Sequence, residues 1–248
     1  MTKSLAIILG CGLGLLVPNY PEVSYAAQQE QMQEEKKPID LRQDRIKKGI
    51  EDWVCCYIDE AGKNLKHVTK AIRSQGAEKV RSPFMSIASD YLALAREKAD
   101  NPKKYDEREQ EEQCHKISRS FLSGLGEVLK DTPIDYSKDK IREAWAKWVN
   151  LKINFSVRLL ASDNNTEGYS ELVRKTFSPE EYRDFLEREI KILNEVYDGL
   201  EASITGVAGL FAKDEINKDR KLSVEFCEKK AYEYYPEAKP KKEKSAEK

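Results

Sequence analysis

The residues best suited to chemistry in this chain are its histidines and cysteines. His67 and His115 are the only histidines, and Glu112 stands three residues before His115 in a segment with helical spacing. A Glu-x-x-His pair on a helix is half of the motif that di-iron carboxylate bundles use twice, with a further Glu from each of two other helices. The second half is missing, because Asn64 precedes His67 where a Glu would be needed. Glu112 and His115 are thus weak candidate metal ligands, and we predict no cofactor.

Four cysteines follow residue 26, and their spacing is not that of a metal site. Two of them are adjacent in a predicted helix, where their side chains point about 100° apart and should not bridge each other. Two interpretations stay open. In one, a disulfide joins one of the adjacent pair to a distant cysteine, which an oxidising compartment permits; in the other, all four are small buried residues. The disulfide candidates are Cys55, Cys56, Cys114 and Cys227.

Patterns of catalytic nucleophiles and nucleotide-binding loops are absent from the sequence after residue 26. It contains no Gly-x-Ser-x-Gly elbow, no Walker loop and no Cys-x-x-Cys-His. A cysteine nucleophile would need Cys114 or Cys55 to meet a histidine from another helix. The sequence therefore favours a protein that is not an enzyme, with a metal-dependent or redox enzyme as an alternative.

Residues 1–26 are typical of a secretory signal peptide. Lys3 precedes an apolar run over 5–17, and Ser24-Tyr25-Ala26 forms a small-x-small cleavage site. The run of about 13 residues is shorter than the ~20 that a membrane-spanning helix needs. We predict cleavage after Ala26 and a secreted or periplasmic protein. Lipoprotein anchoring at Cys11 is the alternative, and the short apolar stretch before this cysteine disfavours it.

The composition indicates long amphipathic helices. Charged residues make up 35% of the chain and hydrophobic residues 40%, with a formal net charge of -1. Such a balance suits helices with one buried stripe and a charged outer surface, and it does not imply a nucleic-acid partner. We predict a flexible lead-in over 27–39, one helical-bundle domain over 40–235 and a disordered charged tail over 236–248.

Apolar residues recur every three or four positions, and strand patterns are nearly absent. We therefore predict an all-α fold, an up-and-down bundle of four to six long amphipathic helices with short connections. Lys152 is the one charged residue on an otherwise apolar stripe. A weaker helical pattern over 213–235 follows the helices predicted over 40–72, 83–100, 103–128, 137–159, 169–177 and 182–211.

Capping residues predict where three of these helices start. Ser178-Pro179-Glu180-Glu181 is a capping box with proline just inside the helix, and it is the strongest local signal after residue 26. Ser82 is predicted to cap a helix that has Pro83 in its first position, and Ser137 to cap another.

Recognition residues are expected in the loop over 162–168, because loops on a rigid scaffold commonly carry binding. The leading hypothesis is an exported, non-enzymatic protein that binds another macromolecule, a protein partner of unknown identity. The alternative is a membrane-active or pore-forming protein that uses the apolar segment 200–212, so membrane contact stays open, as does the oligomeric state. Asn154 and Asn164 each begin an Asn-x-Ser/Thr sequence. The contact-loop residues are Asp163, Asn164, Asn165 and Thr166.

Overall fold

A computed structural model describes residues 41–132, 134–162, 166–204 and 208–240, with the side chains of 66, 67 and 208–211 left out. Over these ranges the chain is all-helical and has no strand, so the predicted all-α class is confirmed. The predicted signal peptide and lead-in lie outside the described residues. The elements are α1 (Leu41–Asn64), α2 (Lys66–Gln75), α3 (Ala77–Asp100), α4 (Glu107–Val128), α5 (Asp139–Ala161), α6 (Tyr169–Thr176), α7 (Pro179–Ser203), α8 (Ala208–Tyr234) and the 3-10 turn η1 (Pro236–Ala238).

The described chain has eight α-helices, so the predicted number of four to six is not confirmed. One reason is a break at Leu65, which is extended and separates α1 from α2. The two helices then pack closely, since a Cβ added at Gly62 would lie 3.0 Å from Cδ1 of Ile72. Gly76, at φ +90°, makes the next turn, a backbone conformation that favours glycine. The apolar spacing continues across Leu65, so periodicity alone did not predict the break.

The predicted start of α3 at Ser82 is wrong, because the helix begins at Ala77 and contains Pro83. Proline inside a helix removes one backbone hydrogen bond and crowds the preceding turn. Here its ring is buried beside α4, where a Cβ on Gly124 would lie 3.7 Å from Cβ of the proline. The proline is therefore a packing residue rather than a helix start.

The other two capping predictions differ in outcome. The capping box of Ser178 and Glu181 is present at the start of α7 and is confirmed. The cap predicted at Ser137 is wrong: its backbone N–H and hydroxyl donate to Asp135, and α5 begins two residues later. These hydrogen bonds are the main reason that the pKa of Asp135 is lowered. Asp135 therefore organises the turn that leads into α5.

The long helix predicted to reach residue 211 ends earlier. Helix α7 stops at Ser203, and Ile204 adopts an extended conformation. Ser, Ile, Thr and Gly occupy 203–206, and these residue types have low helix propensity. The weaker pattern beyond this point corresponds to α8.

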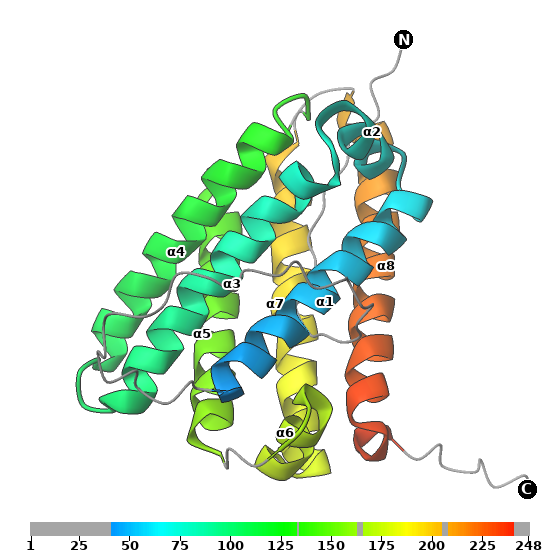
Figure 1. Cartoon of the computed structure of the whole chain (residues 1–248). Helices are drawn as coiled ribbons and strands as arrows, with labels where there is room; N and C mark the ends of the chain where they lie inside the picture. The colour runs from blue at the N-terminus through cyan, green and yellow to red at the C-terminus, as the bar shows by residue number, and fades with distance from the viewer. Residues whose placement is uncertain (1–40, 133, 163–165, 205–207, 241–248) are drawn as a thin grey trace, which may run out of the picture.

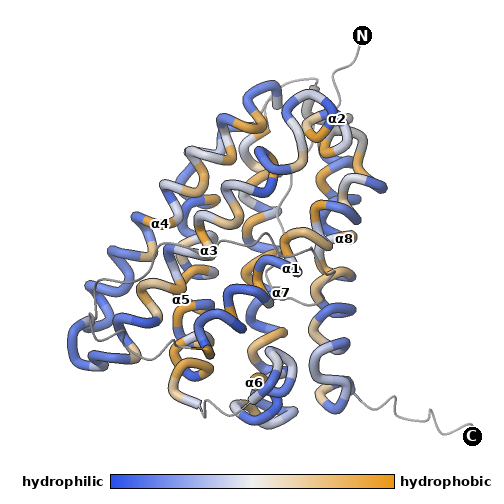
Figure 2. Tube along the Cα trace, in the orientation of Figure 1, coloured by the Kyte–Doolittle hydropathy of each residue, from blue (hydrophilic) through white to orange (hydrophobic). Residues whose placement is uncertain are grey.

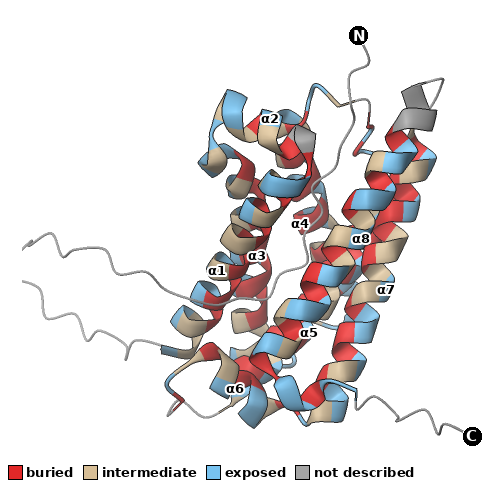
Figure 3. Ribbon diagram, turned by 90° about the vertical axis from the view of Figure 1, so that its right-hand side faces the viewer, coloured by how far each residue is buried: buried red, intermediate tan, exposed pale blue. Residues whose placement is uncertain are grey.

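Helix α5 occupies the middle of the bundle. It packs against α3, α4 and α7, and α1 lies obliquely across the bundle, where it contacts α3, α5, α6 and α8 (Figure 1). Helix α8 packs mainly on α7, and the facing sides of this pair carry the buried residues (Figure 3). Helix α4 lies at the edge and packs mainly against α3 and α5, and hydrophilic residues line much of it (Figure 2). Buried side chains from α1 to η1 form one continuous core.

The turn after α8 is packed against the bundle. Ala238 is fully buried, and its carbonyl accepts a hydrogen bond from Nε of Arg183 at 3.0 Å. The hydroxyl of Tyr235 donates to the carbonyl of Phe177 at 3.0 Å. The tail predicted to be disordered from Pro236 onward therefore starts with an ordered turn, and residues 241–248 lie outside the described residues.

Lys152, the charged exception on the α5 stripe, forms a buried ion pair. Its Nζ lies 2.5 Å from Oε1 of Glu189 on α7, and each side chain is 2% exposed. The same oxygen accepts a hydrogen bond from Nε1 of Trp148 at 3.1 Å. Nζ also lies 5.3 Å from the ring centroid of Trp148 and 5.1 Å from that of Phe185. The charge is thus held by a carboxylate and two aromatic rings.

Replacing Lys152 by methionine should destabilise the protein by about 3–5 kcal/mol, because the Glu189 carboxylate would stay buried without its cation. The double variant K152M/E189Q should recover at least half of this loss, since glutamine is neutral and can still accept from Trp148. Urea unfolding of both variants measures the free energies. A double variant as unstable as the single one would show that burial of the unpaired charge is not the cause.

A second buried polar cluster joins α1, α7 and α8. Asp219 is fully buried, and its carboxyl group accepts hydrogen bonds from the hydroxyls of Tyr57, at 3.3 Å, and Tyr197, at 3.0 Å. The hydroxyl of Ser223 lies within hydrogen-bonding distance of both tyrosines, at 2.8 and 2.7 Å. Burial raises the pKa of Asp219 well above its ordinary value, although the two tyrosine hydrogen bonds lower it.

This raised pKa makes stability depend on pH. The folded protein keeps the Asp219 proton over a range in which the unfolded chain has lost it, so stability falls as pH rises from about 4 through the raised pKa. The variant D219N cannot ionise and keeps hydrogen-bonding groups at the same place. Its melting temperature should exceed that of the wild type by a margin that grows from pH 4 to pH 8.

Thermal unfolding across this range checks the prediction, with D214N, on the exposed side of the same helix, as the matched control. Parallel curves for D219N and the wild type would contradict it.

Candidate functional site

A polar groove runs between α4 and α5, the two helices that meet at the edge of the bundle. It consists of two hollows of about 640 and 590 Å³, and both are lined by His115 and Glu143. The remaining lining residues come from α3, α4 and α5, and all but two are charged or amide side chains. These residues are Lys98, Glu107, Gln110, Glu111, Glu112, Gln113, Cys114, Lys116, Arg119, Asp139, Arg142, Ala146, Lys147, Asn150 and Asn154.

Amide side chains form one end of the groove. Gln110 on α4 is 5% exposed, and its Nε2 donates to Oδ1 of Asn150 and, at 3.2 Å, to Oδ1 of Asn154. Its Oε1 accepts from Nζ of Lys98 on α3. Three helices therefore hold one carboxamide in place, and this carboxamide in turn orients the two asparagines of α5.

The middle of the groove contains Cys114, His115 and Glu111. His115 is partly exposed, and its Nε2 lies 3.9 Å from Oε1 of Glu111. Cys114 is 1% exposed, and burial, with a smaller contribution from Glu111, raises the pKa of its thiol to about 12. A thiol with this pKa is neutral at pH 7, whereas catalytic cysteines have lowered pKa values.

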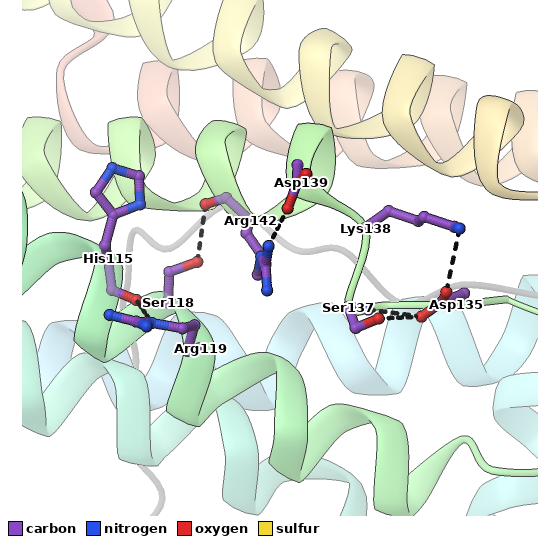
Figure 4. Close-up of polar contacts among 8 residues, drawn as sticks. All are labelled: His115, Ser118, Arg119, Asp135, Ser137, Lys138, Asp139 and Arg142. Carbon is purple, nitrogen blue, oxygen red and sulfur yellow. Dashed lines mark hydrogen bonds and ion pairs between the residues drawn. The ribbon is translucent and has the colours of Figure 1, made fainter.

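Basic side chains are more frequent at the other end, and Figure 4 shows two of them, Arg119 and Arg142. Arg119 on α4 donates to the carbonyl of His115 at 3.2 Å, and the guanidinium of Arg142 on α5 is paired with Asp139. The hydroxyl of Ser118 donates to the backbone carbonyl of Arg142 at 3.0 Å and so fixes the two helices to each other. Lys116 also lines this end.

The candidate metal ligands of the sequence are close in the chain but bind different partners. Oε1 of Glu112 pairs with Nε of Arg108 at 3.3 Å, and His115 faces Glu111 instead. Within the described ranges, no group of three or more His, Cys, Asp or Glu side chains is arranged to hold a metal ion. The side chain of His67 is not described.

All four candidate disulfide cysteines are free thiols. Cys114 and Cys227 are buried, on α4 and α8, while Cys55 and Cys56 are partly buried on α1. Helix α4 contacts α3 and α5, so Cys114 lies in a different part of the core from the other three. Cys56 lines a hollow between α1 and α8. The structure therefore agrees with the interpretation of these cysteines as small packing residues.

The predicted contact loop is described only at its ends. Thr166 is fully buried and accepts a hydrogen bond from Arg45 of α1 at 3.4 Å, so its side chain is not accessible to a partner. Arg42 donates to the carbonyl of Ser162 at 2.8 Å. Asp163, Asn164 and Asn165 lie outside the described residues. Of the two Asn-x-Ser/Thr sequences, the described one has Asn154 in the groove.

The apolar segment 200–212 has buried ends. Leu200 and Ala212 are 0% and 2% exposed, and Ser203 is also buried. The side chains of 205–211 are not described. Among the described helices, none combines the length and apolar character that a membrane crossing requires.

Comparison with known proteins adds no relative: no protein-family model, curated protein or solved structure matches this chain significantly.

The sequence contained one signal for the groove that periodicity arguments overlooked. Asn150 and Asn154 are four residues apart and therefore lie on the same side of α5, beside an apolar stripe. Gln110 gives no comparable signal, since it stands in a charged stretch at the start of α4. Its burial depends on how closely α3 and α5 approach α4.

The four cysteines should react with iodoacetamide in denaturant without prior reduction. In the native protein Cys56 should react first, because it is only partly buried and lines a hollow. Cys114 also lines a hollow but should stay unmodified even at pH 9, because its side chain is buried and its thiol pKa is about 12. Peptide mass mapping identifies the modified residues. Labelling that appears only after reduction would contradict this and support a disulfide.

Proposed function

We propose that this protein acts by binding another macromolecule, and that the groove between α4 and α5 is the contact surface. The observation that carries the proposal is the fixed polar lining of this groove, in which the buried carboxamide of Gln110 orients two further amides. Polar groups held in place before binding lose little conformational entropy when a partner arrives. The groove therefore suits recognition.

The size and chemistry of the groove favour a macromolecule over a small ligand. Small-molecule sites are concave and mostly apolar, with few polar groups. Here charged and amide side chains form nearly the whole lining, and the two hollows together extend along α4 from Glu107 to Arg119 and share His115. At 1.5 Å per residue this stretch is about 18 Å long. Such a polar strip resembles one side of a protein interface more than a ligand pocket.

The proposed setting is the secreted or periplasmic space, on the basis of the signal-peptide pattern of residues 1–26. The chain would work there without catalysis. The neutral thiol of Cys114 and the separate partners of Glu112 and His115 give no support to the redox or metal-enzyme alternative. The buried ends of segment 200–212 likewise give no support to the membrane-active alternative.

Site-specific photocrosslinking tests the proposal. A benzoylphenylalanine at position 143, which lines both hollows, should yield discrete crosslinked products in the exported fraction of cells that make this protein. The same probe at position 228, exposed on α8, is the control. Combining the probe at 143 with Q110M should reduce the products at least about fivefold, because the amide arrangement is lost. Identical products from both positions, or none from position 143, would overturn the proposal.

A further inference from the structure

We infer that the groove binds an extended polypeptide segment that carries a basic side chain at one end and an acidic side chain at the other. This inference rests on the proposed function and names the class of partner. Three properties of the groove carry it: the amides at one end, the length and shape of the polar strip, and the opposite charges of its two ends.

The amides suit a polypeptide main chain. Peptide units present one N–H donor and one C=O acceptor, and a side-chain carboxamide provides both groups as well. Nδ2 of Asn150 takes part in no hydrogen bond with the residues that the structure describes, and it is not among the buried unpaired atoms. Asn154 uses its Nδ2 only for a long contact of 3.4 Å to Asn150. The Nδ2 donors of both asparagines, and one lone pair on Oδ1 of Asn154, therefore remain available in the groove.

The shape of the groove favours an extended segment rather than a helix. A helix that docks in a groove normally inserts an apolar face. Here only Cys114 and Ala146 contribute apolar surface among the lining residues, so the groove gives such a face little to bury against. An extended chain instead pairs its main chain with polar groups. Over about 18 Å, at roughly 3.3 Å per residue, the groove accommodates five or six residues.

The charge at the amide end is negative. Glu107, Glu111 and Glu143 are exposed there, and among the described residues none has a Lys or Arg partner within salt-bridge distance. Of the two lysines of this hollow, Lys147 is neutralised by Glu195, whose Oε2 lies 2.7 Å from its Nζ. Lys98 donates to the neutral amide of Gln110 and keeps its charge, which offsets only one of the three carboxylates. This end therefore attracts a cation, such as the side chain of Lys or Arg.

The charge at the other end is positive. Asp139 pairs with Arg142, and Glu112 pairs with Arg108 outside the hollow. Lys116 and Arg119 remain without a carboxylate partner in the described part of the chain, and they outnumber Glu143, the one unpaired carboxylate that this hollow shares with the amide end. Their distance along α4 from Glu107 and Glu111 corresponds to about 7–18 Å, or roughly two to five residues of extended peptide. A bound segment should therefore have its basic and acidic residues about four positions apart.

Peptide binding by the purified chain tests the inference. The probes are four sets of fluorescent hexapeptides that differ only at the first and fifth positions: Lys with Glu, Glu with Lys, Lys with Lys, and Glu with Glu. The other positions are threonine or valine, which favour an extended chain. One of the two mixed-charge sets should bind at least about tenfold tighter than either like-charge set, and methylation of its central amides should abolish binding.

Two variants assign the binding to the groove. The triple variant E107Q/E111Q/E143Q should lose the preference for a basic residue, whereas the matched control E60Q/E225Q/E228Q, on the α1 and α8 side, should behave as the wild type. All six side chains are exposed or half-exposed, and unchanged melting temperatures would show that both variants fold. A preference that survives E107Q/E111Q/E143Q would overturn the assignment.

The outcomes separate this inference from the proposed function. Crosslinked products at position 143 that return to the mass of the uncrosslinked protein on nuclease or glycosidase treatment would retain a macromolecular partner and overturn the polypeptide inference. Equal or absent binding of all four peptide sets would also overturn it. Failure of the proposed function itself would appear as the absence of any product specific to position 143.

Discussion

The ion pair between Lys152 and Glu189 joins α5 to α7 in the interior of the bundle, and the placement of the other helices depends on it. Two charges in a buried site are tolerated only when they are paired and hydrogen-bonded. This requirement fixes the rotation of α5, because the face that carries Lys152 must meet α7. The opposite sides of α5 then face α3 and α4. Trp148 reinforces the arrangement, since its indole donates to the same carboxylate and its ring packs on Tyr91 of α3.

The groove is a consequence of this orientation. Once α5 is rotated toward α7, its residues Asn150 and Asn154 lie at the boundary with α4, where they meet Gln110. Helix α4 is held on its inner side by Phe121, which packs on Trp145 and Phe84. Its outer side carries exposed polar residues. Aromatic packing thus holds the inner side of α4 in place, while its polar outer side is free to serve as a recognition surface.

Much of the architecture could be predicted from residue patterns. The all-α class, the long helices and the capping box of Ser178 follow from spacing and side-chain type, which are local properties. Two of the misplaced boundaries share one cause, because tertiary packing overrides local preference there. Pro83 lies inside α3 because its ring is buried against α4, and α1 ends at Asn64 because the chain bends there to fold α2 back over Gly62.

The sequence by itself determined the class of the fold, its charge balance and Lys152 as an exception that needed a partner. Only the tertiary structure decided which partner that is, and which polar residues gather at a surface. Glu189 and Gln110 are unremarkable in their own segments, since charged and amide residues are frequent throughout the chain, and the spacing of Asn150 and Asn154 indicates only that they share one side of α5. Their roles arise from contacts between residues on different helices, and these residues are 12 to 44 positions apart in the sequence. Helical periodicity describes one helix at a time, whereas the groove depends on how three helices pack together.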